Sequence, residues 1–87
     1  MKHTFNGDGI SGDFILEPGA SVGYAVSGTF AGRIDIDEYR HNSWQVRESG
    51  LVNQGLSGTL DNGGLNLARY RFHAHDWHGG EATAALL

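Results

Sequence analysis

VGYAVSGTFAGRIDIDEY, residues 22–39, is the stretch that decides the fold class of this 87-residue chain. Its apolar residues alternate with small or polar ones, first through Val22, Tyr24 and Val26 and later through Ile34. Because a β-strand sends successive side chains to opposite faces, this period of two buries one face and leaves the other in water. The stretch therefore predicts strands of a small antiparallel sheet with one face in a core.

The same alternation continues toward both ends of the chain, in short segments separated by turn residues. Pro18-Gly19 and Asn62-Gly63 favour tight turns, since proline presets φ and Asn-Gly tolerates positive φ. These features predict an all-β fold, a single small antiparallel β-sandwich of six to seven strands, immunoglobulin-like or jelly-roll-like. The expected strands are residues 13–17, 20–27, 29–39, 44–52, 55–60, 66–75 and 81–87, with the second and third joined or bent at Gly28.

The two ends of the chain are predicted to contact other subunits. Residues 1–12, MKHTFNGDGISG, are glycine-rich, which predicts a flexible arm ahead of a sandwich domain at residues 13–87. In this arm Phe5 and Ile10 would pack against a neighbouring subunit. The last expected strand carries one charge, so we expect an open sheet edge at which Leu87 contacts a second copy, unless the final leucines close the core instead.

The composition describes a small domain with a thin core. The chain has 14 glycines and no cysteine, so neither a disulfide nor a thiolate metal site reinforces it. Small domains of this kind often gain stability by association, which favours a homo-oligomer. The net charge of −4 argues against phosphate binding, and no apolar run approaches the about 20 residues that span a bilayer. We therefore expect no nucleic-acid partner, no membrane partner and no signal peptide.

Residues 69–72 interleave arginine with aromatic residues, as RNA-binding sheets do. On a strand, however, Arg69 and Arg71 point to one face while Tyr70 and Phe72 point to the other. The two kinds of side chain in this segment cannot form one stacking surface, which is a second argument against nucleic-acid binding.

Two motifs suggest a ligand, and each has a plainer structural explanation. His73, His75 and His78 are candidate zinc or nickel ligands, although histidines at strand ends are often simply solvated. Residues 7–12 match the dinucleotide fingerprint G-x-G-x-x-G, which functions only between a strand and a helix. Because a strand is expected after it, the fingerprint is interpreted as a glycine loop.

Asp35, Asp37 and Glu38 form an acidic segment. The two aspartates share a strand face and could serve as an acid–base pair. The simpler interpretation is a solvated acidic face that blocks edge-to-edge pairing and forms ion pairs with Arg33, or with arginines 69 and 71 of a neighbouring strand. No nucleophile motif accompanies the carboxylates, so we expect neither enzymatic activity nor a cofactor.

The tryptophans are expected to differ in role. Trp44 begins an alternating segment and is predicted to fill the core, and Tyr70 is a candidate corner tyrosine with a structural hydroxyl bond. Trp77 lies in a polar turn, where it could anchor a partner protein or a sugar ring, or fold over its own sheet.

Five short motifs follow one another along the chain: residues 17–22 (EPGASV), 26–32 (VSGTFAG), 44–46 (WQV), 68–72 (ARYRF) and 81–86 (EATAAL). In this order they resemble small β-sandwich proteins encoded among bacteriophage virion genes, and the resemblance spans about residues 5–87. The chain departs from that pattern at residues 38–43 (EYRHNS), where an Asp-Gly-Gly type turn is usual.

The resemblance implies a non-enzymatic structural protein of the virion, assembled in the host cytoplasm. The first hypothesis is a decoration or cement subunit that binds the major capsid protein or a neck protein. The second is a tail or fibre module that recognises a host glycan through Trp77, Tyr39 and nearby polar groups. Partner contacts are expected at Phe5, Ile10, Trp77 and Leu87.

Overall fold

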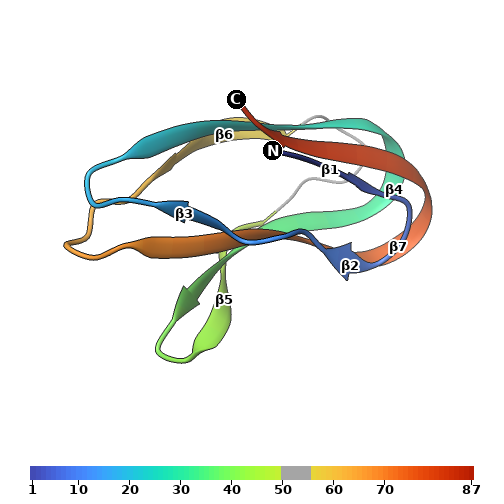
Figure 1. Cartoon of the computed structure of the whole chain (residues 1–87). Coiled ribbons are helices and arrows are strands. Elements are labelled where there is room, and N and C mark those ends of the chain that lie inside the picture. Colours follow the sequence, from blue (N-terminus) through green and yellow to red (C-terminus); the bar gives the residue numbers. More distant parts are fainter. Residues whose placement is uncertain (50–55) are drawn as a thin grey trace.

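Two long strands carry the architecture of the protein. In the computed structural model, which describes residues 1–49 and 56–87, β4 (Ser21–Arg40) and β7 (Ala68–Leu86) pair antiparallel along almost their whole length. The resulting ribbon doubles back on itself, so that each strand runs through both layers of a sandwich (Figure 1). No helix long and apolar enough to cross a membrane occurs in the described part of the chain.

The shorter strands widen the two halves of this ribbon into layers. β1 (Lys2–Phe5) pairs with the end of β7, and β6 (Leu56–Asp61) pairs with the start of β4, which completes the first layer. In the second layer β7 is flanked by β2 (Gly9–Ile10) and β3 (Phe14–Leu16), and β4 is flanked by β5 (Ser43–Glu48). The predicted all-β antiparallel sandwich is confirmed, as one seven-stranded sheet folded over.

The sequence predicts a join or bend at Gly28 and a turn at residues 76–80, and in the structure β4 bends without a break while residues 76–80 lie within β7. The pairing shifts register between Ala31 and Arg33, where Gly32 lies opposite the three residues 76–78. The extra residues on β7 form a bulge, and bulges bend the strand that contains them. Residues 76–80, which the sequence pattern predicts as a turn between two strands, thus lie within β7 and carry it around the corner.

Two glycines make this corner possible. Gly28 and Gly80 have φ values of 126° and 85°, in the region that favours glycine. A Cβ at Gly80 would lie 2.2 Å from the carbonyl oxygen of Thr29, and a Cβ at Gly28 would lie 2.3 Å from that of Glu81. Any side chain at either position would push the two strands apart at the bend.

Trp77 fills the inner side of the same corner, where it packs against the core. Its ring stacks on Phe30 with centroids 5.2 Å apart and planes 5° apart, and its indole N–H donates to the carbonyl oxygen of Gly80 at 3.2 Å. Its backbone N–H donates to Asp8 Oδ1 at 2.9 Å, and Gly32 leaves room for the ring. Of the three roles considered for Trp77, the structure shows the one in which it folds over its own sheet.

The core consists of the inward side chains of both layers. The alternation predicted for residues 22–39 is correct, since Tyr24, Val26, Ile34 and Ile36 are all buried. Side chains that meet them from β6 and β7 are Leu60, Tyr70, Phe72, Ala74, Ala82 and Ala84.

The prediction of a flexible arm at residues 1–12 is wrong. β1 pairs residue by residue with β7, and Phe5 is only 3% exposed because it fills the core beneath the first layer. Farther along, the Ser11 N–H donates to the Phe72 carbonyl oxygen at 2.9 Å, and the Phe72 N–H donates to Ser11 Oγ at 2.8 Å. The segment therefore belongs to the sandwich, and Phe5 is not available to a neighbouring subunit.

Two further predictions fail for reasons of pairing order. The last strand, expected at residues 81–87 as an open edge, is the end of β7 and lies between β1 and β4. Trp44, expected in the core, lies opposite Tyr39 on the outer side of the second layer and is half-buried. The strands predicted at 44–52 and 55–60 correspond to β5 and β6, and their positions within residues 50–55 lie outside the described part.

Replacing Gly80 with alanine is expected to lower the free energy of unfolding by about 3 kcal/mol or more, or to prevent folding. Both the positive φ and the approach of Thr29 oppose a Cβ there. Gly63→Ala is the matched control, because a Cβ at Gly63 meets nothing within 4 Å, and its effect should stay within about 0.5 kcal/mol. Urea unfolding measures both, and a Gly80→Ala protein as stable as its control would show that the corner tolerates side chains.

The stability should fall in alkali because two tyrosines are buried. Burial, aided by the charge of Glu48, raises the pKa of Tyr24, and burial, aided by Glu38, raises the pKa of Tyr70. A phenol that holds its proton more tightly when folded stabilises the protein fully below its ordinary pKa of about 10, and this contribution disappears as the pH rises through the raised value. Urea unfolding from about pH 8 to about pH 11.5 should show this loss.

The variants Tyr24→Phe and Tyr70→Phe test the assignment. Each removes one ionising phenol, so the alkaline decrease in unfolding free energy should become shallower in both, whatever their stability at neutral pH. An alkaline slope identical to that of the parent protein in both variants would place the titrating groups elsewhere.

Candidate functional site

The outer side of the second layer gathers most of the polar side chains that the sequence singled out. Strand alternation turns every second residue of β4, β5 and β7 outward here, and the register brings these side chains side by side. We call this surface the outer face, and its members are Asp35, Asp37, Tyr39, Trp44, Val46, Arg69, Arg71, His73 and His75.

Aromatic rings and guanidinium groups alternate at one end of the outer face. The guanidinium carbon of Arg71 lies 4.2 Å from the centroid of the Trp44 ring, and that of Arg69 lies 4.4 Å from the centroid of Tyr39. Tyr39 and Trp44 meet edge to face with centroids 5.2 Å apart. Cation–π contacts of this geometry fix both the arginines and the rings in place.

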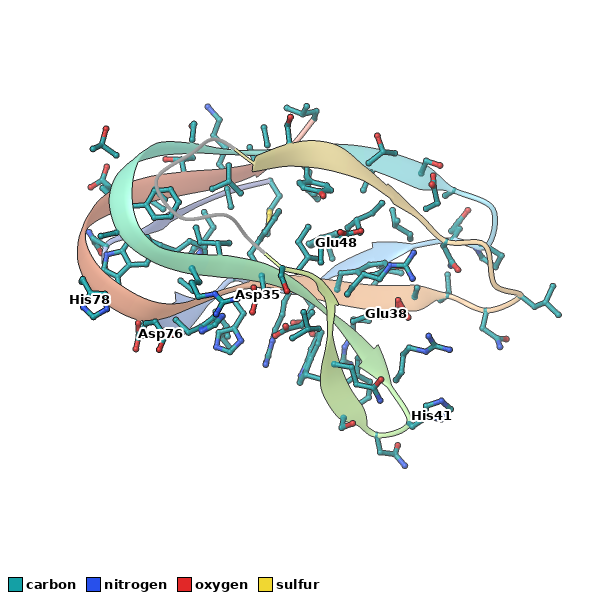
Figure 2. All side chains as sticks on the ribbon, turned by 180° about the vertical axis from the view of Figure 1, so that it is seen from behind. Asp35, Glu38, His41, Glu48, Asp76 and His78 are labelled. Atoms are coloured by element: carbon teal, nitrogen blue, oxygen red, sulfur yellow. The ribbon has the colours of Figure 1, made fainter. Side chains whose placement is uncertain are left out.

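A tight turn sets up this arrangement. His41 and Asn42 both have positive φ, 52° and 64°, which is the type I′ geometry that joins two strands by a two-residue loop. The loop fixes the register of the β4–β5 hairpin, so that Tyr39 lies directly opposite Trp44. Figure 2 shows His41 at the tip of this hairpin.

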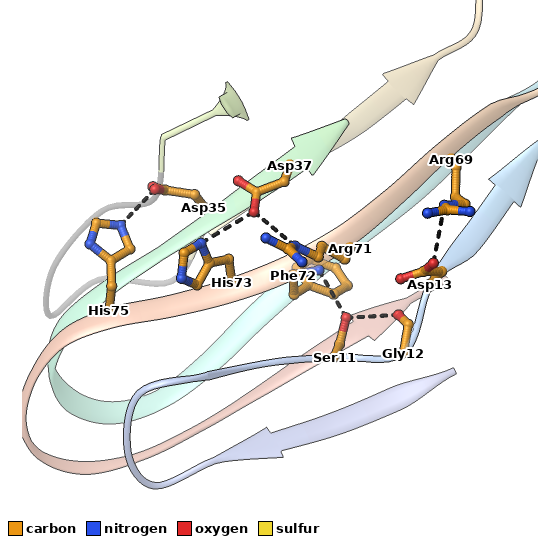
Figure 3. A network of polar contacts seen from close by, with 10 residues as sticks. All are labelled: Ser11, Gly12, Asp13, Asp35, Asp37, Arg69, Arg71, Phe72, His73 and His75. Carbon is orange, nitrogen blue, oxygen red and sulfur yellow. Dashed lines mark hydrogen bonds and ion pairs between the residues drawn. The ribbon is translucent and has the colours of Figure 1, made fainter. Parts of the chain in front are cut away.

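Two buried carboxylates hold the other end of the outer face together (Figure 3). Asp37 is 3% exposed, and its Oδ2 accepts a hydrogen bond from Arg71 Nε at 3.0 Å and lies 3.2 Å from His73 Nδ1. Asp35 is 6% exposed, and its Oδ2 lies 2.6 Å from His75 Nε2. Because a buried carboxylate without a partner is costly, these pairings explain how two acids can lie under the surface of a central strand.

The margins of the outer face are partly apolar. Val46 is 59% exposed on one side, and Ile15 and Ile10 are exposed on the other, opposite Arg69 and His73. Arg69 also forms an exposed ion pair with Asp13 at 3.1 Å. The face therefore combines fixed charges and aromatic rings with aliphatic side chains in contact with water.

The interpretation of Asp35 and Asp37 as a solvated acidic edge is wrong, since both are buried and β4 is a central strand. The predicted pairing across the sheet is confirmed for Asp37 with Arg71. Each aspartate faces a base, and within the described residues neither His73 nor His75 contacts a serine or threonine hydroxyl.

The candidate metal ligands do not converge. His73 and His75 are neighbours on the outer face with ring centroids 5.3 Å apart, and each is paired with an aspartate. His78 belongs to the bulge, and Figure 2 shows it at the bend beside Asp76. Across residues 1–49 and 56–87, no three histidine or acidic side chains form a group that could hold a metal ion.

The four expected partner-contact residues are scattered. Phe5 is in the core, and Trp77 packs at the bend. Ile10 is exposed at the margin of the outer face, whereas Leu87 is 81% exposed at the C-terminal end of the first layer. In Figure 1 the C-terminus and the β4–β5 hairpin lie at opposite sides of the molecule.

The cluster of aromatic rings around the arginines was missed by sequence reasoning. Arg69 and Arg71 do point away from Tyr70 and Phe72, as expected, but neighbouring strands supply other rings to the arginine side. The sequence feature that could have revealed the cluster is the length of the turn at residues 40–43. A two-residue loop there pairs Tyr39 with Trp44 and so puts both rings on the same face.

No protein-family model, curated protein or solved structure matches this chain.

Replacing Asp37 with asparagine is expected to lower the free energy of unfolding by about 2–3 kcal/mol, because it leaves the largely covered Arg71 guanidinium without its carboxylate. Asp13→Asn is the matched control, since Asp13 pairs with Arg69 in water and such pairs contribute less than about 1 kcal/mol. Urea unfolding at neutral pH compares them. Equal losses in the two variants would mean that the buried network does not hold the outer face together.

Proposed function

We propose that this protein is a non-enzymatic structural subunit of a bacteriophage virion, a decoration or cement protein that binds the capsid or neck through its outer face. The observation that carries the proposal is the cluster of Tyr39, Trp44, Arg69 and Arg71, bordered by the exposed Val46. Tryptophan, tyrosine and arginine are the residues most enriched at the energetic centres of protein–protein interfaces.

The rigidity of the cluster supports a role in binding. Arg71 is held by Asp37 on one side and by the Trp44 ring on the other, so its side chain is already ordered before any partner arrives. Binding a preordered surface costs less conformational entropy than binding a mobile one. The motif order described in the sequence supports the virion as the place where this surface is used.

Recognition of a host glycan is the second candidate. A sugar ring stacks on an open aromatic face, but Trp77 is committed to Phe30 and the Gly80 carbonyl group. Tyr39 has Arg69 over its ring and Trp44 at its edge. The rings proposed for a glycan are thus occupied by the protein itself, and a protein partner is favoured.

We also propose that the subunit associates with copies of itself. Within the described residues, β1, β5 and β6 each pair with one strand only, so each leaves a row of backbone groups open to a further strand. Contact through the last strand, as expected from the sequence, is replaced here by contact through these edges. Sedimentation of the purified protein measures the association state directly.

The virion proposal is tested with Val46→Asp on the outer face. Phage heads that lack the subunit, freed of tails, are incubated with the purified protein and sedimented. Adding a charge at an exposed interface position should weaken binding to heads at least about tenfold in a protein that is still folded; because Val46 lies directly opposite Asp37, the melting temperature should also fall by a few degrees.

Leu87→Asp is the matched control, because Leu87 is also exposed but lies far from the outer face. It should bind heads like the parent protein. Loss of binding in Leu87→Asp together with full binding by Val46→Asp would assign the contact to the C-terminal end. Binding to tails alone, with Trp fluorescence that shifts on adding sugar, would favour the glycan hypothesis instead.

A further inference from the structure

The end of the sandwich opposite the bend contains a cavity of about 410 Å³. It lies between the inner side of the β4–β5 hairpin and the loop formed by residues 62–67, both of which Figure 1 shows away from the corner of the ribbon. A volume of this size is in the range of sites for small ligands. Trp44 and Arg71 of the outer face do not line the cavity, and Tyr39 is the one member of the outer face that borders both sites.

The base of the cavity is formed by a buried tyrosine and a largely covered carboxylate. Burial and the charge of Glu38, together with its hydrogen bond to the phenol, raise the pKa of Tyr70, whereas the positive charges of Arg47 and Arg40 lower it. Both guanidinium groups are therefore close enough to influence the base of the cavity. All four side chains line it.

The two arginines have donors to spare. Arg40 Nε lies 3.4 Å from Glu38 Oε1, and Arg47 Nη2 donates to the carbonyl oxygen of Asp61 at 3.4 Å. Each guanidinium carries several more N–H donors than these long contacts use. Within the described residues Arg47 has no carboxylate at ion-pair distance, so its guanidinium is not engaged in a direct salt bridge.

Two carboxylates also line the cavity, so its four charged side chains sum to zero, but neither carboxylate is paired directly with Arg47. Glu38 is engaged by Arg40 and by the Tyr70 hydroxyl, and the side chain of Asp61 accepts a hydrogen bond from Ser21. The chain as a whole has a net charge of −4. An anionic group that enters the cavity therefore meets guanidinium donors that the protein itself leaves unused, on a chain whose overall charge repels acidic molecules elsewhere.

The opposite wall is apolar and held in position. Leu65 is 92% exposed, and Leu67 is also exposed, although both line the cavity. The loop that carries them is fixed by Asn62, whose amide nitrogen donates to the carbonyl oxygens of Leu16 and Asn66 at 3.0 and 2.8 Å. A ligand here meets guanidinium donors on one side and leucine side chains on the other.

We propose that this cavity binds a carboxylate carried on an apolar group, and that its occupant in the particle is an acidic side chain of the partner protein flanked by an apolar residue. The carboxylate is bound by Arg47 and Arg40, and the apolar part covers Leu65 and Leu67. The identity of the occupant rests on the proposed virion function, whereas the chemistry of the cavity does not.

The test uses hexanoate, the simplest carboxylate with an aliphatic chain, and isotope-labelled full-length protein. Hexanoate should shift the NMR signals of the Arg40 and Arg47 side chains and the methyl signals of Leu65 and Leu67, with a Kd of roughly 1–10 mM. Hexanamide has the same shape without the charge and should bind at least about tenfold more weakly.

Arg47→Gln should weaken hexanoate binding at least about tenfold. Arg33→Gln, an exposed arginine outside the cavity, is the matched control and should bind hexanoate like the parent protein. Equal binding of hexanoate and hexanamide, or equal losses in the two variants, would overturn the proposal. So would shifts of these signals with methyl glucoside in the absence of any with hexanoate, which would identify a sugar site.

Comparison with head binding separates the two proposals. If hexanoate fails to bind while Val46→Asp still abolishes attachment to heads, only the cavity proposal is wrong. If hexanoate binds and depends on Arg47 while Val46→Asp attaches normally, the carboxylate site stands and the outer face is not the virion contact.

Discussion

The close passage of β4 and β7 at their shared bend is the constraint on which the rest of the structure depends. Gly28 and Gly80 bring each strand so near the backbone of the other that no Cβ fits between them. Glycine in a strand normally weakens it, because it loses more backbone entropy and contributes no side chain. Here every other strand pairs with β4 or β7, so both layers exist only if this ribbon can turn back on itself.

The bend also explains why one ribbon can serve two purposes. Its inner side supplies apolar residues from both layers, so a chain of 87 residues without disulfides encloses a core. Its outer side carries the residues between them, and the acidic ones are covered by the arginine and histidine side chains that contact them. Because Asp37 binds Arg71 and His73 together, the arginine is held against Trp44 without help from a partner. The contacts of Asp37 therefore keep the aromatic and arginine side chains of the outer face in the arrangement proposed to bind a partner.

The sequence predicts what depends on local alternation and misses what depends on pairing order. Inward residues such as Ile34 and Phe72, and the all-β class, follow from a period of two. A period of two does not show which of the two alternating sets of side chains faces the core. Trp44 is therefore predicted in the core from the sequence, whereas its pairing with Tyr39 puts it on the outer face. Glycine was interpreted as a signal for a loop at residues 1–12 and for a turn at 76–80, although a strand or a bulge accommodates it equally well. The candidate site was found in part, because its charged residues are visible in the sequence and its cross-strand partners are not.

The two candidate surfaces share the β4–β5 hairpin, and this is the strongest physical link between them. Residues that alternate along it face opposite sides, with Tyr39 and Trp44 toward the outer face and Glu38 and Arg47 toward the cavity. The hairpin extends beyond the body of the sandwich, so both of its sides are accessible (Figure 1). A partner that contacts both sides would meet aromatic rings on one side and, on the other, the Arg47 guanidinium, which has no direct salt bridge within the described residues. Since β5 pairs with β4 alone within the described residues, backbone hydrogen bonds from a partner strand would fix the register in which those two sets of contacts form.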